Sequence, residues 1–167
     1  IEVKPLPSVY GTGAELILIE KCLGREVPHG GLPAAAGAIV MNVTSVSSLG
    51  KYLATGMPVV SRVITVDGAA CEQPPNLIVP LGTSYADVLN TAGLKGGVTR
   101  GKVVAGGAMM GPAVENLSYP TTKTTSGLIM LSDTAAQPAP VSPCIRCGRC
   151  VEYCPMGLEP VEVNQAY

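Results

Sequence analysis

Apolar and polar positions follow a helical period near the start of the chain. Residues 14–23 (AELILIEKCL) place apolar side chains three and four positions apart, and Gly24 can then adopt the left-handed conformation that ends a helix. We therefore expect a helix over 14–23. A proline- and glycine-rich turn follows, and the short apolar run at 38–41 predicts a strand.

A second helix is predicted after this strand. Thr44 or Ser45 can cap its first turn because a hydroxyl oxygen accepts hydrogen bonds from the free N–H groups there, and the helix is expected to end near Gly56. From Pro58 onward the pattern changes to that of β-strands. We therefore place a boundary after residue 57.

Strands dominate the next part of the chain. Residues 59–66 (VVSRVITV) are rich in β-branched side chains and predict a strand, and Asp67 and Gly68 then form a hairpin signal because both tolerate positive φ. Residues 69–72 would return as the second strand. A third strand is expected at residues 77–79 after a proline-rich turn.

A short helix is predicted over residues 85–92, capped by Thr83 or Ser84 and closed by Gly93. Two more apolar runs predict strands, at 102–105 and 128–131. The order strand, hairpin, helix, strand is typical of a small α+β unit with a mixed sheet. Since the chain has no Phe or Trp, the core must be built from Val, Ile, Leu and Met.

Composition narrows the classes of partner. The 167 residues include 11 Lys and Arg against 12 Asp and Glu, a formal net charge of -1, which argues against nucleic acid because phosphate binding relies on clustered cations. Charged residues are 14% of the chain, whereas about 25% is usual. We therefore expect a piece of a larger assembly. Because the chain begins at Ile1, without an initiator Met or a leader, we also expect truncation at both ends.

Mean hydropathy is +0.35, which raises the question of a membrane span. Residues 27–50 carry no charge, yet Pro28, Pro33, Asn42 and several hydroxyl side chains interrupt the run. A spanning helix needs about 20 predominantly apolar residues, so no direct membrane span is expected.

The last part of the chain carries the most specific chemistry. Residues 132–143 (SDTAAQPAPVSP) combine polar side chains with three prolines, which is typical of a linker. A boundary is therefore expected just before a run of cysteines with the spacing C-x2-C-x2-C-x3-C, which Pro155 follows directly. The run consists of Cys144, Cys147, Cys150 and Cys154.

This spacing is typical of bacterial ferredoxins, in which thiolates hold a 4Fe-4S cluster and the fourth cysteine ligates the other cluster of a pair. With one such run in the chain, either a second run lies beyond Tyr167 or a remote cysteine completes the site. A zinc site would more naturally separate two C-x2-C pairs, and a disulfide framework needs an oxidising compartment, so both are weaker alternatives.

Other residues near or outside the run have more than one interpretation. Arg146 and Arg149 lie inside it and either offset the thiolate charge or serve solubility. Cys22 and Cys71 are distant in sequence, and we expect each to be a small buried hydrophobic residue.

Residues 10–15 (YGTGAE) place two glycines and an acid at the mouth of the first helix. Such a turn lets backbone N–H groups approach a phosphate, but the third glycine of a dinucleotide fingerprint is absent. Alone, this turn does not identify a ligand.

Joined to later segments, the turn becomes more specific. The chain resembles the C subunit family of the Rnf complex in the order of its motifs, Y-G-T-G-A-E, G-R-E-V-P-H-G-G-L-P, N-V-T-S, V-I-T-V-D-G, L-G-T-S-Y-A-D-V-L, G-G-A-M-M-G and C-I-R-C-G-R-C-V-E-Y-C-P-M-G-L. The resemblance covers essentially the whole chain. That family comprises membrane-attached oxidoreductases that couple electron transfer between ferredoxin and NAD to ion translocation.

The resemblance also implies a set of cofactor-binding residues. In the related flavoprotein of respiratory complex I, a Tyr-x-x-Gly-x-Glu turn and an Asn-Val-x-Thr segment line the flavin and nicotinamide site. On this chain the matching residues are Tyr10, Gly13, Glu15, Asn42 and, with Ser in place of Thr, Ser45. Ala14 stands where the relative has a second acid, and the glycine-rich loop expected upstream is missing. Each residue also has a structural alternative. Tyr10 would be a loop aromatic, Asn42 a turn residue, Ser45 a helix cap, and Glu15 a first-turn acid that the helix dipole favours.

The fold class that the resemblance implies is α+β in several parts. Residues 1–57 would be the distal part of an α/β flavin- and NADH-binding domain, and 58–131 a β-grasp unit of the soluble ligand-binding type. After the linker at 132–143, residues 144–167 would begin a ferredoxin-like unit. The implied cofactors of the intact protein are FMN, NADH and two 4Fe-4S clusters.

The expected function is that of an electron-transfer subunit, within an NADH/ferredoxin oxidoreductase complex. Its partners would be other subunits of a membrane redox complex and ferredoxin or a ferredoxin-like protein, at the cytoplasmic face of the bacterial cell membrane. Two alternatives remain open. One is a related flavin/iron-sulfur reductase such as the cobalamin reductase of propanediol-utilising bacteria, and the other is a non-enzymatic docking fragment with a zinc or vacant cysteine site.

Overall fold

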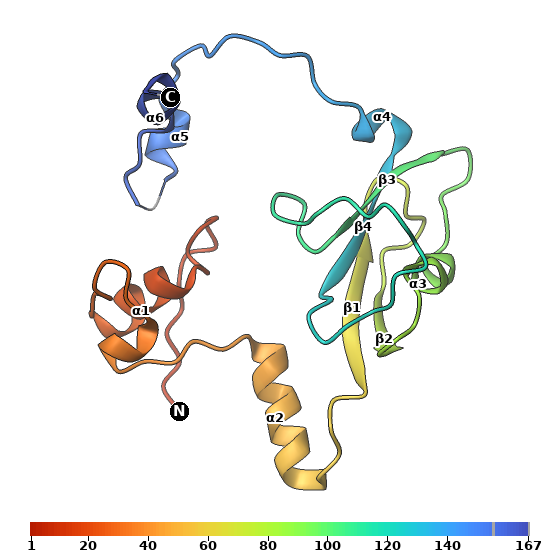
Figure 1. Ribbon diagram of the computed structural model, residues 1–167, viewed down its shortest axis with the longest axis horizontal. Helices are drawn as coiled ribbons and strands as arrows, with labels where there is room; N and C mark the ends of the chain where they lie inside the picture. The colour runs from red at the N-terminus through yellow and green to blue at the C-terminus, as the bar shows by residue number, and fades with distance from the viewer. Residues whose placement is uncertain (155, 167) are drawn as a thin grey trace. The chain divides into compact units, whose positions relative to one another are not determined.

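A computed structural model describes residues 1–154 and 156–166 (Figure 1). The chain divides into two compact units. The first combines residues 1–47 with 142–167, and the second spans residues 48–141.

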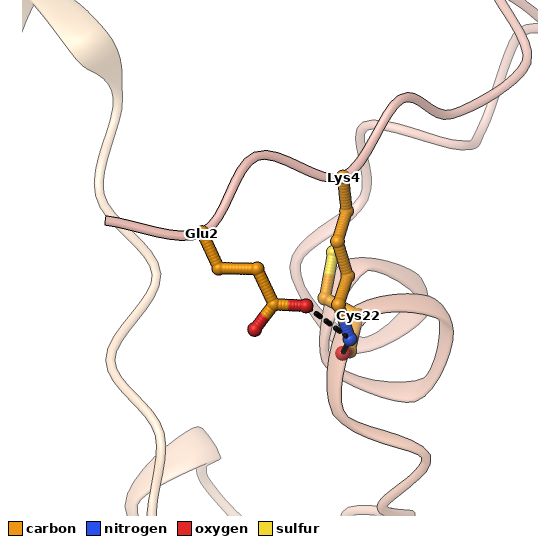
Figure 2. Close-up of polar contacts among 3 residues, drawn as sticks. All are labelled: Glu2, Lys4 and Cys22. Atoms are coloured by element: carbon orange, nitrogen blue, oxygen red, sulfur yellow. Dashed lines mark hydrogen bonds and ion pairs between the residues drawn. The ribbon is translucent and has the colours of Figure 1, made fainter.

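The first predicted helix is confirmed as α1 (Glu15–Leu23). Ile17 and Ile19 are its buried residues, and Gly24 closes it at φ 63°, where its N–H donates to the carbonyl of Glu20 at 2.8 Å. Near this end the Nζ atom of Lys4 donates to the carbonyl of Cys22 at 2.5 Å (Figure 2). A lysine stabilises a helix C-terminus because the last carbonyls lack helical partners, so this contact holds the N-terminal segment against α1.

The strand predicted at residues 38–41 is wrong. The chain there follows the 3-10 helix η1 (Pro33–Ala36), which Gly37 ends at φ 68°, and residues 38–42 then run without regular structure. A strand exists only where another strand accepts its backbone hydrogen bonds, and none of the described strands pairs with this segment.

The second predicted helix is α2 (Val43–Thr55), and its end at Gly56 is confirmed by a φ of 70°. Its beginning differs from the expectation. The side chain of Asn42, and not that of Thr44 or Ser45, accepts the first-turn hydrogen bond, from the N–H of Thr44 at 2.9 Å. No residue of α2 is buried, and the exposed side chains include Val43, Val46, Leu49, Tyr52 and Leu53.

The second unit is built on the mixed sheet that the sequence predicted. Its strands are β1 (Ser61–Asp67), β2 (Asn76–Pro80), β3 (Arg100–Ala105) and β4 (Gly127–Ser132). The order across the sheet is β2-β1-β4-β3 (Figure 1). The central pair β1 and β4 is parallel, and both outer pairs are antiparallel.

The core of this unit lies between the sheet and α3 (Tyr85–Ala92). The predicted cap is confirmed, since the hydroxyl of Ser84 accepts from the N–H of Asp87 at 3.1 Å. The largest core side chains are aliphatic or methionine, as expected from a chain without Phe or Trp. They are Ile64, Val66, Val79, Val88, Leu89, Val103, Leu128 and Met130.

The return strand predicted at residues 69–72 is also wrong. The strand that pairs with β1 is β2, in a register that places Ile64 opposite Leu77. Residues 69–70 instead form a turn at β4, where the N–H of Ala70 donates to the carbonyl of Met130 at 3.0 Å. Gly68 makes this approach possible: its φ is 120°, and a Cβ there would lie 2.2 Å from the Met130 carbonyl oxygen.

After β4 the predicted linker segment begins with one helical turn, α4 (Asp133–Ala136), which packs against β3. Residues 137–148 have no regular structure, and two short helices follow, α5 (Arg149–Glu152) and α6 (Pro160–Gln165). Across residues 1–154 and 156–166, the helices are all too short or too polar to cross a membrane.

Candidate cofactor sites

The cysteine run lies around α5. Cys144 and Cys147 precede this helix, Cys150 lies within it and Cys154 follows it. The first three side chains are exposed and the fourth is half-buried. Two left-handed residues turn the chain between the first and third cysteines, Arg146 at φ 52° and Gly148 at φ 75°. The segment therefore bends repeatedly over a few residues, as a loop that wraps a compact group must.

Two of the four sulfur atoms accept backbone hydrogen bonds. The N–H of Arg146 donates to Sγ of Cys144, and the N–H of Leu158 donates to Sγ of Cys154, each at 3.4 Å. Such donors stabilise negative charge on a thiolate, and hydrogen bonds to the sulfurs are one of the ways in which a protein tunes the potential of an iron-sulfur cluster.

Two hollows adjoin the run. One of about 340 Å³ is lined by Cys144, Arg146, Pro160, Val161, Asn164 and Gln165. The other, of about 180 Å³, is lined by Arg146, Gly148, Cys150, Val151, Glu159, Val161 and Glu162. Arg146 and Val161 line both hollows, so both lie between the cysteine loop and α6.

The donor set fits an iron-sulfur cluster in its chemistry. Four soft thiols at this spacing suit iron, and amide donors already point at two of them. In the part of the chain that the structure describes, however, three or more Cys, His, Asp or Glu side chains do not come together as a ligand set. The thiols share a loop without converging, and the assignment of Cys144, Cys147, Cys150 and Cys154 as ligands stays a prediction.

The turn of the first candidate flavin residues is well formed. The N–H of Thr12 donates to the carbonyl of Val9 at 3.1 Å, and the N–H of Ala14 donates to that of Gly11 at 3.0 Å. Tyr10 is 66% exposed, and a Cβ added at Gly13 would meet open space. This surface is therefore accessible to a ligand.

The N-terminus of α1 is suited to an anionic ligand. Ala14 is its N-cap and supplies no side-chain hydrogen bond, so the first N–H groups lack a side-chain acceptor. Unpaired N–H groups at a helix N-terminus favour an anion. Glu15 is the first residue of the helix and is exposed, where a carboxylate is favourable to the helix dipole.

The second candidate pair lies at the start of α2. Asn42 caps this helix and Ser45 is exposed in its first turn. Within the described residues, no hydrogen bond or ion pair joins this pair to Tyr10, Gly13 or Glu15. The structure thus gives Asn42 a capping role, a signal that the sequence carried, because Asn is among the strongest N-caps.

The remaining cysteines differ from the run. All six cysteines are free thiols. Cys71 is buried in the core, as predicted, and this burial raises the pKa of its thiol. A hydrogen bond with the backbone of Gln73 lowers the pKa, whereas the negative charges of Asp67 and Glu72 raise it further. Cys22 is half-buried, so the expectation of burial is met only in part.

Comparison with known proteins defines the class of the first part of the chain. Residues 1–51 match the family described as the Nuo51 FMN-binding domain. These residues include the YGTGAE turn, α1 and the start of α2. The relation to the complex I flavoprotein is thereby confirmed.

The whole chain is related to the C subunits of ion-translocating oxidoreductases. It is 41% identical to the C subunit of the proton-translocating ferredoxin:NAD(+) oxidoreductase complex of Clostridium ljungdahlii, over 96% of this chain and 35% of that protein. It is 38% identical to the C subunit of the Na(+)-translocating ferredoxin:NAD(+) oxidoreductase complex of Acetobacterium woodii, over 99% and 37%.

A third relative extends the comparison. The C subunit of the ion-translocating oxidoreductase complex of Pseudomonas aeruginosa is 39% identical, over 95% of this chain and 20% of that protein. The resemblance to the Rnf C subunit is therefore confirmed. The chain spans about a third of the length of the first two relatives and a fifth of the third.

Proposed function

We propose that this chain is part of an electron-transfer subunit that passes electrons between NADH, a flavin and iron-sulfur clusters in a membrane-attached ferredoxin:NAD oxidoreductase complex. The observation that carries the proposal is its similarity, over nearly all of its length, to relatives whose names state that activity. An FMN-binding domain match and a ferredoxin-type cysteine run in one chain support the same electron path.

The cysteine run holds the first 4Fe-4S cluster in this proposal. Cys144, Cys147, Cys150 and Cys154 supply the thiolates, with the fourth directed to a second cluster of the intact protein. The cluster supplies one-electron transfer, whereas the chain's own residues bind, orient and tune it. The N–H groups of Arg146 and Leu158 donate to the sulfurs of Cys144 and Cys154 and would help to orient them toward the cluster.

The flavin and nicotinamide side is assigned to the N-terminal turn and the start of α2. The N–H groups at the mouth of α1 would face an anionic part of FMN or NADH, with Tyr10 and Gly13 beside it. Glu15 would accept hydrogen bonds from the nucleotide, and Asn42 and Ser45 would approach from α2. These residues serve the intact protein, in which the rest of the flavin site is present.

The domain organisation is proposed on the same basis. Residues 1–57 belong to the flavin- and NADH-binding domain, 58–131 form a β-grasp unit, 132–143 connect it, and 144–167 begin a ferredoxin-like unit. The mixed sheet with a parallel central pair and one helix against it supports the β-grasp assignment.

Partners and location follow from the complex. We assign the chain to the cytoplasmic face of the bacterial cell membrane, where it would contact other subunits peripherally together with a ferredoxin or ferredoxin-like protein. The names of two relatives at similar identity specify protons in one case and Na(+) in the other, so the proposal includes no particular ion.

Iron analysis tests the proposal. The native protein, purified without oxygen, is expected to contain iron and acid-labile sulfide and to absorb near roughly 400 nm, as iron-sulfur proteins do. Cys147→Ser should lower the iron content because it removes one ligand, whereas Cys22→Ser, which changes a cysteine outside the run, should not.

Two results would contradict the assignment. The first is equal iron content in the two variants. The second is zinc in place of iron, which would favour a docking role instead. Co-purification with microcompartment enzymes in place of membrane subunits would instead favour a cobalamin reductase.

A further inference from the structure

Arg146 has a backbone conformation that its residue type seldom adopts. Its φ is 52°, and it is the one non-glycine residue with positive φ among residues 1–154 and 156–166. A side chain with a Cβ is disfavoured there, so surrounding interactions must maintain the conformation. Such outliers gather at functional sites, and this one lies inside the cysteine run.

The main chain at this residue also contacts Cys144. The N–H of Arg146 donates to Sγ of Cys144, at 3.4 Å. Gly148, also left-handed, then turns the chain into α5. The main chain at Arg146 thus orients the first sulfur of the run.

The side chain of Arg146 occupies a second special place. It lines both the hollow that contains Cys144 and the hollow that contains Cys150. Arg149 carries the same charge three residues later but lines neither hollow. Of the two arginines inside the run, only Arg146 therefore lines either of these two hollows.

Among residues 1–154 and 156–166, Arg146 makes no ion pair within 4.0 Å. Glu159 and Glu162 line the smaller hollow with it, yet in the described part of the chain the ion pair within 4.0 Å joins Lys4 to Glu2. A guanidinium is a delocalised cation with five N–H donors. Its positive charge is therefore available to whatever the thiols hold.

We propose that Arg146 is a positioning residue that raises the reduction potential of the 4Fe-4S cluster held by the cysteine run. This inference rests on the proposed function. Its N–H fixes the Cys144 thiolate, and its guanidinium stabilises the additional negative charge that the cluster carries after it accepts one electron from the flavin side. The same electron passes on to the next carrier, so the arginine changes the potential and takes no part in bond making.

Substitutions at Arg146 separate charge from conformation. Asn and Gly both tolerate positive φ and retain the N–H, so Arg146→Asn and Arg146→Gly remove the guanidinium without opposing the backbone conformation. Arg146→Lys keeps the charge, and Arg149→Asn is the matched control, a lost charge in the same run away from both hollows.

The measurement is redox potentiometry followed by electron paramagnetic resonance on the native, anaerobic protein. The signal that Cys147→Ser removes identifies the cluster. At the wild-type midpoint we expect Arg146→Asn and Arg146→Gly to lower the ratio of reduced to oxidised cluster several-fold; a tenfold change would equal about 59 mV for a one-electron couple. Arg146→Lys should restore most of the ratio, and Arg149→Asn should change it much less.

An unchanged potential in both neutral variants would overturn the proposal, as would an equal shift in Arg149→Asn. Arg146→Asn and Arg146→Gly could both lose iron. In that case, iron retained by Arg146→Lys would support the need for the charge, and iron lost from Arg146→Lys would refute that need. A wild-type protein without iron would refute the proposed function itself, a distinguishable result.

Discussion

Replacing Gly68 by alanine tests the packing at the centre of the sheet. The new methyl group would lie 2.2 Å from the carbonyl oxygen of Met130, and 2.7 Å from its carbonyl carbon and its nitrogen. These are main-chain atoms of β4, a central strand paired on both sides, so they cannot move aside as a flexible side chain would. The φ of 120° adds strain for any residue with a Cβ.

The magnitude follows from these two effects. Holding a non-glycine residue in so sparsely populated a conformation costs about 1 to 3 kcal/mol. Forcing extra atoms into a packed interior costs about 1 to 3 kcal/mol more, here because a shift of Met130 would also disturb its neighbour Leu128 in the core. We expect Gly68→Ala to lower the free energy of unfolding of the sheet unit by about 4 kcal/mol, a large part of the roughly 5 to 15 kcal/mol that is usual for a domain.

Hydrogen exchange with mass spectrometry measures this effect locally. Peptides that contain β1 and β4 should lose protection in Gly68→Ala by the factor that corresponds to the lost free energy. Gly96→Ala is the matched control, because Gly96 is exposed, lacks positive φ and has no atom within 4 Å of the added Cβ. Its effect should stay within about 0.5 kcal/mol. Equal protection in the two variants would refute the reasoning from Met130.

Three other predictions concern single side chains. Burial raises the pKa of the Cys71 thiol above 9.0, so the unfolded chain loses this proton first, and the free energy of unfolding should fall as pH rises above 9.0 towards the folded pKa. Urea titrations from neutral to alkaline pH should show a smaller fall in Cys71→Ala. An identical fall in the two proteins would contradict this prediction. Ser84→Ala should destabilise α3 by about 1 kcal/mol through loss of its cap, and unchanged exchange in the first turn would disprove it. In the native protein, Glu15→Gln should slow flavin reduction by NADH while FMN content is retained. Glu20 is exposed on the same helix, and Glu20→Gln should leave the rate unchanged. Equal rates for the two variants in stopped-flow absorbance would remove Glu15 from the site.

The elements that local signals define were predicted well from the sequence. α1 and α3 end where Gly24 and Gly93 stand, and the hydroxyl of Ser84 begins α3, because helix caps are made by residues a few positions apart. The strands of the mixed sheet were likewise located by their β-branched and apolar runs.

The errors arose where a distant partner decides the structure. Residues 38–41 are apolar enough for a strand but have no strand to pair with in the described chain. Asp67 and Gly68 signalled a tight hairpin, yet the glycine is needed for its close approach to Met130, far along the sequence. Neither fact can be derived from residues nearby.

The same division separates the two candidate sites. The candidate cysteine ligands follow one another within a short loop, so their spacing alone indicates the chemistry. The candidate flavin residues come from two segments that no described hydrogen bond joins, and their assignment depends on the resemblance. The left-handed backbone of Arg146 was not predicted, because its residue type gives no sign of it.

The parallel pairing of β1 with β4 affects the order of events during synthesis. Thr65 pairs with Gly127, so the middle of the sheet must wait until most of this chain has left the ribosome, whereas the hairpin of β1 and β2 can form early. Until then Ile64 and Val66 lack their neighbours on β4. A nascent chain arrested before Gly127 would therefore expose the apolar face and the unpaired edge of β1, and chaperones would be expected to bind it.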